Sequence, residues 1–297
     1  MIDLSEMPTE TVNENSKNLS SLNALEAVRL FNQEDVKAVK CIESQYENIT
    51  KVIELTSYAL SNGGRIIYMG AGTSGRLGLI DAVECPPTFG VDYNTVVGLI
   101  AGGENAFIKA EEGAEDSLEF GRVDLDKINL TNKDVVIGIA ASGRTPYVIG
   151  GLNYAKEKGC KIGAIVCNYN SKIKEICEST IEIVPGPEVL TGSTRLKAGT
   201  ATKLVLNMIS TISMINQGKV FKNYMVDVKM SNAKLIQRGI NIICAVTDCS
   251  EELAKEKLIE SNNSVKEAIV MILLDCNHQS AKSQLEKANG YIDRLVR

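Results

Sequence analysis

The chain has 297 residues, of which 44% are hydrophobic, and a formal net charge of −5 at pH 7. That length allows one large domain or two smaller ones, and the negative charge argues against nucleic acid or an anionic membrane as partner. No apolar run approaches the roughly 20 residues of a membrane span, and residues 1–20 are polar and acidic, unlike a secretory signal. These features predict a cytoplasmic protein.

The eight cysteines are scattered, and His278 is the only histidine. Because no C-x-x-C pair is present, a structural zinc site is not expected. The cysteines are predicted to be small buried hydrophobic residues in a reducing compartment. Cys85 is the exception to watch, because it adjoins Glu84.

The N-terminal part predicts helices preceded by an arm. Residues 1–20 are polar and on composition alone indicate a disordered arm. Residues 22–31 are a short helix candidate. Hydrophobic residues at spacings of three, four and seven predict one long helix over 34–60, ended by the polar and glycine-rich segment 61–64.

Five apolar segments then alternate with helical ones. The predicted strands span 66–69, 95–101, 134–141, 162–167 and 180–184. Strand–helix alternation at this spacing indicates an α/β fold, a parallel sheet with helices on both faces. The ligand of such a sheet binds outside the carboxyl ends of the strands.

The C-terminal part is predicted to be helical. A helix with an apolar face is expected over 195–217, and four shorter helices over 232–246, 250–261, 263–274 and 278–294. We expect three parts: the N-terminal arm and helices over 1–46, the α/β domain over 47–228, and a small helical module over 229–297.

The turn from Gly70 to Gly75 predicts a phosphate site, because it joins a strand to a helix whose first N–H groups and positive dipole end attract anions. Its G-x-G-x-x-G pattern also occurs in dinucleotide folds, but Asp92 precedes the second strand instead of ending it. Hydroxyl-rich turns at 142–145 and 191–194 lie at the same sheet edge. A single such hydroxyl is more often a helix cap, but their repetition favours a phosphate monoester.

Glu84 is a candidate general acid. Pro86 and Pro87 predict that the helix after Gly75 ends near Val83 or Glu84. The Glu84 carboxyl would then lie at the negative end of the helix dipole among apolar neighbours, and both effects raise its pKa. An ordinary surface glutamate at a helix end remains an equal alternative.

Glu115 is a candidate base within an acidic cluster that also contains Glu111, Glu112, Asp116 and Glu119. Neighbouring like charges raise a carboxyl pKa toward a range useful for a base. Composition favours a solvated acidic face, and the sequence does not determine which member points into the cleft.

Five segments together resemble the N-acetylmuramic acid 6-phosphate etherase family, which is built on a sugar-isomerase (SIS) domain, a flavodoxin-like sandwich. They are GAGTSGRLGLIDAVECPPTFG, VVGLIAGGENA, EGAEDS, GIAASGRTPYV and EVLTGSTRLKAGTATKLVLNM. The resemblance, which covers essentially the whole chain, implies a bacterial enzyme of peptidoglycan recycling that removes the D-lactyl ether of N-acetylmuramic acid 6-phosphate.

The resemblance also implies a mechanism. A base takes the C2 proton of the open-chain sugar, an acid protonates the departing lactyl oxygen at C3, and water adds at C3. The products are N-acetylglucosamine 6-phosphate and D-lactate. Neither a metal nor a redox cofactor is needed, and the family's members are homodimers.

Site residues follow from the same resemblance. The acid falls on Glu84 and the base on Glu115. The implied phosphate contacts are Ser74, Ser142 and Thr145, with Gly72, Thr73, Gly143 and Arg144 close by. The residues expected to complete the pocket, where a cation could meet the lactyl carboxylate, are Glu188, Ser193, Thr194, Arg195 and Lys197.

Two other functions remain open at this point. A non-catalytic SIS regulator that senses a sugar phosphate would need the phosphate site but not both carboxylates. An aldose–ketose phosphosugar isomerase would share the C2 proton abstraction but would need no acid at C3. The intact motifs around Glu84 and Glu115 favour the etherase.

Overall fold

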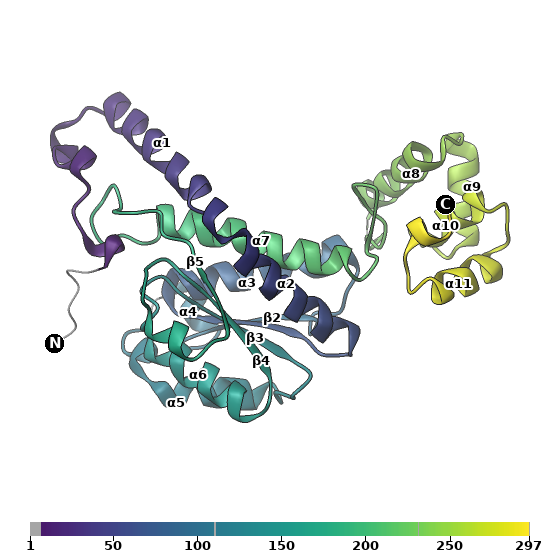
Figure 1. Cartoon of the computed structure of the whole chain (residues 1–297). Coiled ribbons are helices and arrows are strands. Elements are labelled where there is room, and N and C mark those ends of the chain that lie inside the picture. The colour runs from purple at the N-terminus through teal and green to yellow at the C-terminus, as the bar shows by residue number, and fades with distance from the viewer. Residues whose placement is uncertain (1–6, 110, 231, 297) are drawn as a thin grey trace. The chain divides into compact units, whose positions relative to one another are not determined.

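The computed structural model describes residues 7–109, 111–230 and 232–296, which form two compact units (Figure 1). The first unit comprises the chain through Val83 together with Asn94–Ser210. The second comprises Glu84–Tyr93 and the chain from Thr211 onward. Each unit has its own core and is described separately.

The first unit is built on a five-stranded parallel sheet with the strand order β2-β1-β3-β4-β5. The strands are β1 (Ile66–Gly70), β2 (Val96–Ile100), β3 (Val135–Ala140), β4 (Lys161–Val166) and β5 (Ser179–Glu182). Every residue of β1 and β3 is buried, which explains why these strands are continuous apolar runs in the sequence. The predicted α/β class and all five strands are confirmed.

Helices cover both faces of this sheet (Figure 1). One face carries α5 (Leu118–Lys127) and α6 (Pro146–Glu157), and the other carries α2 (Tyr46–Ser61), α3 (Gly72–Phe89) and α7 (Lys197–Ile215). The core beneath α5 and α6 includes Met69, Leu125 and Leu152, all fully buried. The short helix α4 (Asn105–Ile108) follows β2.

The prediction of one continuous helix over 34–60 is wrong. The structure has α1 (Ala24–Lys40), a 3-10 turn η4 (Glu43–Gln45) and then α2. At the break, Ile42 is buried and the Gln45 side chain accepts a hydrogen bond from the backbone N–H of Glu182 in β5. The hydrophobic spacing continues across so short a turn, so periodicity alone does not reveal the break.

The prediction of a disordered arm is also wrong for the residues from Met7 onward, while residues 1–6 lie outside the described residues. Three 3-10 turns form here: η1 (Pro8–Glu10), η2 (Glu14–Ser16) and η3 (Leu19–Ser21). Thr9 is fully buried and exchanges hydrogen bonds with the Asn168 side chain. Contacts 159 residues away along the chain thus order a segment whose own composition would leave it unstructured.

The predicted end of α3 is wrong as well, because the helix continues through Pro86 and Pro87 to Phe89. Each proline removes one N–H from the helical hydrogen bonds. Beyond them, the Thr88 hydroxyl donates to the Glu84 carbonyl at 2.7 Å, and the N–H of Gly90 donates to the Pro86 carbonyl at 3.0 Å. Burial of Phe89 in the second unit further offsets the loss.

The second unit contains the expected helical module. Its helices are α8 (Ala233–Thr247), α9 (Glu251–Glu260), α10 (Val265–Leu273) and α11 (His278–Lys287), followed by the 3-10 turn η7 (Ile292–Arg294). A short antiparallel hairpin, which the sequence did not predict, precedes them. Its strands are β6 (Val220–Phe221) and β7 (Tyr224–Met225). Ile243, Ile269 and Val270 lie at the centre of its core. Within the described ranges, no helix has the length and apolar character needed to cross a membrane.

Candidate functional site

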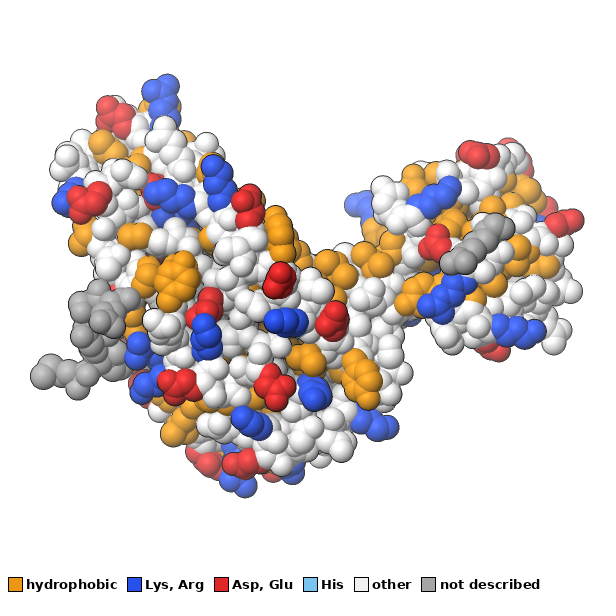
Figure 2. Space-filling model, in the orientation of Figure 1, with side chains coloured by type: hydrophobic (Ala, Val, Ile, Leu, Met, Phe, Trp, Pro, Cys, Tyr) orange, Lys and Arg blue, Asp and Glu red, His pale blue; other side chains and the backbone are white. Residues whose placement is uncertain are grey.

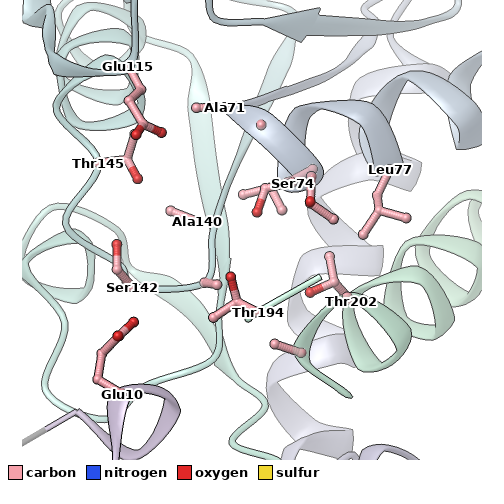
Figure 3. Close-up of a pocket in the computed structure, with 16 residues that line it drawn as sticks. Glu10, Ala71, Ser74, Leu77, Glu115, Ala140, Ser142, Thr145, Thr194 and Thr202 are labelled. Carbon is pink, nitrogen blue, oxygen red and sulfur yellow. The ribbon is translucent and has the colours of Figure 1, made fainter. Parts of the chain in front are cut away.

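A pocket of about 270 Å³ lies in the first unit, at the carboxyl end of the sheet (Figure 3). The turn between β1 and α3, the turn between β3 and α6, and the start of α7 form most of its wall. This is the position expected for the ligand of a parallel sheet.

The structure brings half of the predicted site residues to this pocket. Those that line it are Gly72, Thr73, Ser74, Glu115, Ser142, Thr145 and Thr194. Those that do not line it are Glu84, Gly143, Arg144, Glu188, Ser193, Arg195 and Lys197.

The turn between β1 and α3 is compact because glycines pack against each other. A Cβ atom on Gly70 would lie 2.8 Å from the backbone nitrogen of Gly75, and one on Gly75 would lie 2.7 Å from the Gly70 carbonyl oxygen. Helix α3 therefore begins directly at the end of the strand, at Gly72. The first turn of α3 lines the pocket. The N–H groups of this turn lack helical partners, and the helix dipole is positive at this end.

The turn between β3 and α6 supplies two hydroxyls. Gly143 has a φ of +65°, and a Cβ there would lie 2.3 Å from the Ser171 Cβ, so this position requires glycine. Thr145 precedes Pro146, the first residue of α6, but its side chain makes no capping hydrogen bond. The helix-cap explanation therefore does not apply to Thr145, and its hydroxyl remains available to a ligand.

Glu115 is the member of the acidic cluster that lines the pocket. It lies in the 3-10 turn η5 (Ala114–Asp116), which follows Gly113 with a φ of +78° and is anchored by buried Ala114. Figure 3 shows its carboxylate directed toward Thr145 and the cavity. Glu111 and Glu112 instead line neighbouring cavities.

Glu84 has a different environment from the one predicted. Its side chain is exposed, and α3 continues five residues beyond it to Phe89. The predicted position at a helix end is therefore wrong, and the argument from the helix dipole falls with it. Its assignment as the acid stays a prediction that rests on the family resemblance.

Glu188 and Lys197 are buried away from the pocket instead of lining it. The Lys197 ammonium lies 2.7 Å from Oε2 of Glu34 in α1, and both side chains are inaccessible to solvent or nearly so. The Glu188 carboxylate accepts hydrogen bonds from the backbone N–H groups of Lys197 and Ala198, each at 2.9 Å. The two residues thus fix the start of α7, which presents Ala198 and Thr202 to the pocket.

The charges in this buried network affect each other strongly. Burial alone would raise the pKa of the Glu34 carboxyl, but hydrogen bonds from Lys197, Lys37, Asn15 and Asn13 outweigh burial and lower it to about 2. Burial also raises the pKa of Glu188, against the opposing effect of its two backbone hydrogen bonds. Lys197 is therefore committed to Glu34, and Arg195 is the remaining predicted cation of this segment, with an exposed side chain.

Two polar residues of the pocket were not predicted. Thr202 follows Ala198 by four residues in α7, so helical spacing from the predicted segment could have indicated it. Glu10 comes from the N-terminal arm, where the sequence carries no corresponding signal. Within the described part of the chain, the pocket lining includes two carboxylates and no basic side chain.

The cysteines do not form a nucleophilic site in the first unit. Cys167 is fully buried, and burial raises its pKa to about 12. Burial likewise raises the pKa of Cys160 to about 11. Cys85, in the second unit, is buried as well. Thiols with raised pKa values are poor nucleophiles at neutral pH.

Family models match most of the chain. The model of the glucokinase regulatory protein N-terminal SIS domain matches residues 48–156, and the SIS domain model matches 123–212. The model of the C-terminal lid domain of glucokinase regulatory protein matches 222–268. A solved structure of a putative phosphosugar isomerase from Bacteroides fragilis NCTC 9343 shares the fold, with a TM-score of 0.52 and 15% identity over 70% of this chain and 98% of that chain.

Curated relatives are much more similar. The N-acetylmuramic acid 6-phosphate etherase of Francisella tularensis subsp. holarctica is 58% identical over 97% of this chain and 98% of its own length. The enzyme of the same name from Bacillus mycoides is 51% identical over 99% of this chain and all of its own length. The chain therefore belongs to the N-acetylmuramic acid 6-phosphate etherase family, as the sequence motifs predicted.

Proposed function

We propose that this protein is a carbon–oxygen lyase that cleaves the D-lactyl ether of N-acetylmuramic acid 6-phosphate. Identity of 58% to an etherase over nearly the whole chain carries this proposal. The pocket is compatible with it, because hydroxyls and a helix N-terminus can receive a phosphate close to the carboxylate of Glu115. The same relatives do not favour a regulator or an isomerase.

The reaction needs a base and an acid. In the open-chain sugar the C1 aldehyde acidifies the C2 proton, which Glu115 removes. The bond between C3 and the lactyl oxygen breaks as Glu84 protonates that oxygen. D-Lactate departs, and the remaining sugar is an unsaturated aldehyde with a double bond between C2 and C3. Water then adds across the double bond, with hydroxide at C3 and a proton at C2, to give N-acetylglucosamine 6-phosphate.

We assign the phosphate to the hydroxyls of Ser74, Ser142 and Thr145. Ser74 lies in the first turn of α3, and the other two lie in the turn between β3 and α6. Because no basic side chain is among the described lining residues, the positive charge would come from the α3 dipole and its free N–H groups. Gly143 would act through the shape of the turn, not through contact with the ligand.

We further propose that the enzyme is a homodimer. Four large hydrophobic side chains of α1 are strongly exposed: Leu25, Val28, Val36 and Val39. Figure 2 shows hydrophobic side chains exposed among the charged ones on the face it presents. A second copy could cover such residues. A cytoplasmic location and a role in peptidoglycan recycling are proposed from the family resemblance.

The test is D-lactate release from N-acetylmuramic acid 6-phosphate by the wild type and by Glu84→Gln and Glu115→Gln variants. We expect release by the wild type and a loss of at least about 100-fold in both variants, the usual contribution of a general acid or base. Glu119→Gln, an exposed member of the same acidic cluster, should retain activity. Sugar-phosphate binding by the wild type without lactate release would instead indicate a regulator.

A separate variant tests the predicted contact of Arg195 with the lactyl carboxylate. Arg195→Ala should raise KM for the lactyl substrate without weakening binding of N-acetylglucosamine 6-phosphate, which lacks the lactyl group. An unchanged KM would remove Arg195 from the site.

A further inference from the structure

The N-terminal arm is fixed to the rest of the first unit at several points. The Asn168 amide donates to the Thr9 hydroxyl at 2.9 Å and to the Ala141 carbonyl at 2.9 Å. The Asn13 amide donates to Glu34 at 2.8 Å and to the Pro187 carbonyl at 3.1 Å. Glu10 lies between these anchors, in a turn closed by a hydrogen bond from its N–H to the Met7 carbonyl.

The Glu10 side chain extends from this anchored turn into the pocket (Figure 3). Its carboxylate and that of Glu115 enter the cavity from opposite ends, with Ser142 and Thr145 between them in this view. Oε2 of Glu10 lies 3.1 Å from the position that a Cβ on Gly192 would occupy, so it rests against the turn that supplies Thr194. With the residues that the structure describes, its carboxylate forms neither a hydrogen bond nor an ion pair.

A carboxylate directed into a pocket that we propose to bind a phosphate has a restricted set of partners. An ionised carboxylate only accepts hydrogen bonds, and it repels a phosphate or a second carboxylate. The donors it can accept from in an amino-sugar phosphate are the neutral hydroxyl and acetamido N–H groups. Holding the carboxylate at this place is therefore useful only if the neutral part of the ligand lies beside it.

We propose that Glu10 is a further substrate-binding residue, which accepts hydrogen bonds from the hydroxyl or acetamido N–H groups of the sugar and directs the phosphate toward the start of α3. This inference rests on the proposed function for the identity of the sugar. Glu10 affects the orientation of the substrate in two ways. It accepts hydrogen bonds from the neutral donors of the sugar, and it repels the phosphate and the lactyl carboxylate from the end of the pocket near the arm.

The first experiment compares Glu10→Ala with Glu14→Ala. Glu14 lies in the same arm, but its side chain is exposed and pairs with Lys17. Calorimetry should show that Glu10→Ala binds N-acetylglucosamine 6-phosphate about 10- to 100-fold more weakly, the loss expected for hydrogen bonds to a charged group. Its affinity for inorganic phosphate should not fall, and Glu14→Ala should match the wild type in both titrations.

A second pair of variants displaces Glu10 without altering it. Gly192 and Gly186 have nearly equal φ values of +76° and +78°, so alanine strains the backbone similarly at both. Only at Gly192 does the new methyl group meet the Glu10 carboxylate, because nothing lies within 4 Å at Gly186. Gly192→Ala should weaken sugar-phosphate binding more than Gly186→Ala does.

Kinetics separate binding from chemistry. Glu10→Ala should raise KM for N-acetylmuramic acid 6-phosphate by a similar factor while kcat falls much less. A loss confined to kcat, or affinity for the sugar phosphate equal to that of the wild type, would overturn the inference. Equal weakening for inorganic phosphate would overturn it too. A wild type that binds the sugar phosphate but releases no lactate would contradict the proposed function alone, because the calorimetric comparison of Glu10 would remain valid.

Discussion

The ammonium group of Lys197 lies 2.7 Å from a carboxylate oxygen of Glu34, and this ion pair joins α7 to α1 across 163 residues of sequence in the interior of the first unit. Its position explains why Lys197, which the family resemblance implied as a residue completing the pocket, does not line the pocket. A buried charge without its partner is far less stable than a paired one.

Glu34→Gln should destabilise the protein by about 3–5 kcal/mol, because it leaves the Lys197 ammonium buried without a counter-charge. Urea unfolding at pH 7, followed by circular dichroism, measures this free energy. Glu54→Gln, at an exposed position of α2, is the control and should change it by less than about 0.5 kcal/mol. Equal unfolding midpoints for the two variants would contradict the role assigned to the pair.

Acid should remove this contribution over a defined pH range. The pKa of Glu34 is about 2 in the folded protein and 4.5 without the protein environment. A lowered pKa gives stability that is complete above about pH 4.5 and is lost as the pH falls toward 2. The difference in unfolding free energy between the wild type and Glu34→Gln should therefore shrink from pH 5 to pH 2.5. A difference that stayed constant over this range would contradict the assignment.

Gly143→Ala should harm the pocket more than Gly103→Ala. Both glycines have positive φ values, +65° and +74°, so both variants strain the backbone. Only Gly143 would bring a Cβ within 2.3 Å of Ser171, because nothing lies within 4 Å at Gly103. We expect a greater loss of thermal stability and of sugar-phosphate affinity for Gly143→Ala. Similar effects in both variants would mean that φ alone requires glycine there.

Ser142→Ala and Thr145→Val should each weaken binding of inorganic phosphate and of N-acetylglucosamine 6-phosphate about tenfold, since each removes one hydrogen bond to an anion. Thr200→Val is the control, because Thr200 is exposed on α7 and its hydroxyl bonds to the Leu196 carbonyl. Calorimetry with both ligands measures the effect. If phosphate affinity were unchanged while affinity for the sugar phosphate fell, these hydroxyls would contact the sugar instead.

The sequence predicted those parts of the fold that depend on neighbouring residues. The buried strands are apolar runs, and glycine, hydroxyl and proline positions marked the turns at Gly72 and Thr145, which meet in the pocket. Helical breaks were less visible, because the turn at Gln45 preserves the hydrophobic spacing. Two prolines suggested a helix end that packing and local hydrogen bonds overrode.

Contacts between distant residues could not be predicted. Lys197 and Arg195 look equally available in the sequence, and only the buried carboxylate of Glu34 distinguishes them. Glu10 lies in a polar segment whose order depends on Asn168 and Pro187. The division of the chain at residues 46 and 228 and the role of Glu84 stay predictions.

The anchoring of the arm also has a consequence for biosynthesis. Glu10 leaves the ribosome well before the residues that hold the arm, because Asn168 follows Thr9 by 159 residues and Pro187 follows Asn13 by 174. At ordinary rates of translation, roughly ten to thirty seconds pass between the synthesis of the arm and that of these partners. The pocket therefore acquires Glu10 only after the chain has been synthesised past Pro187.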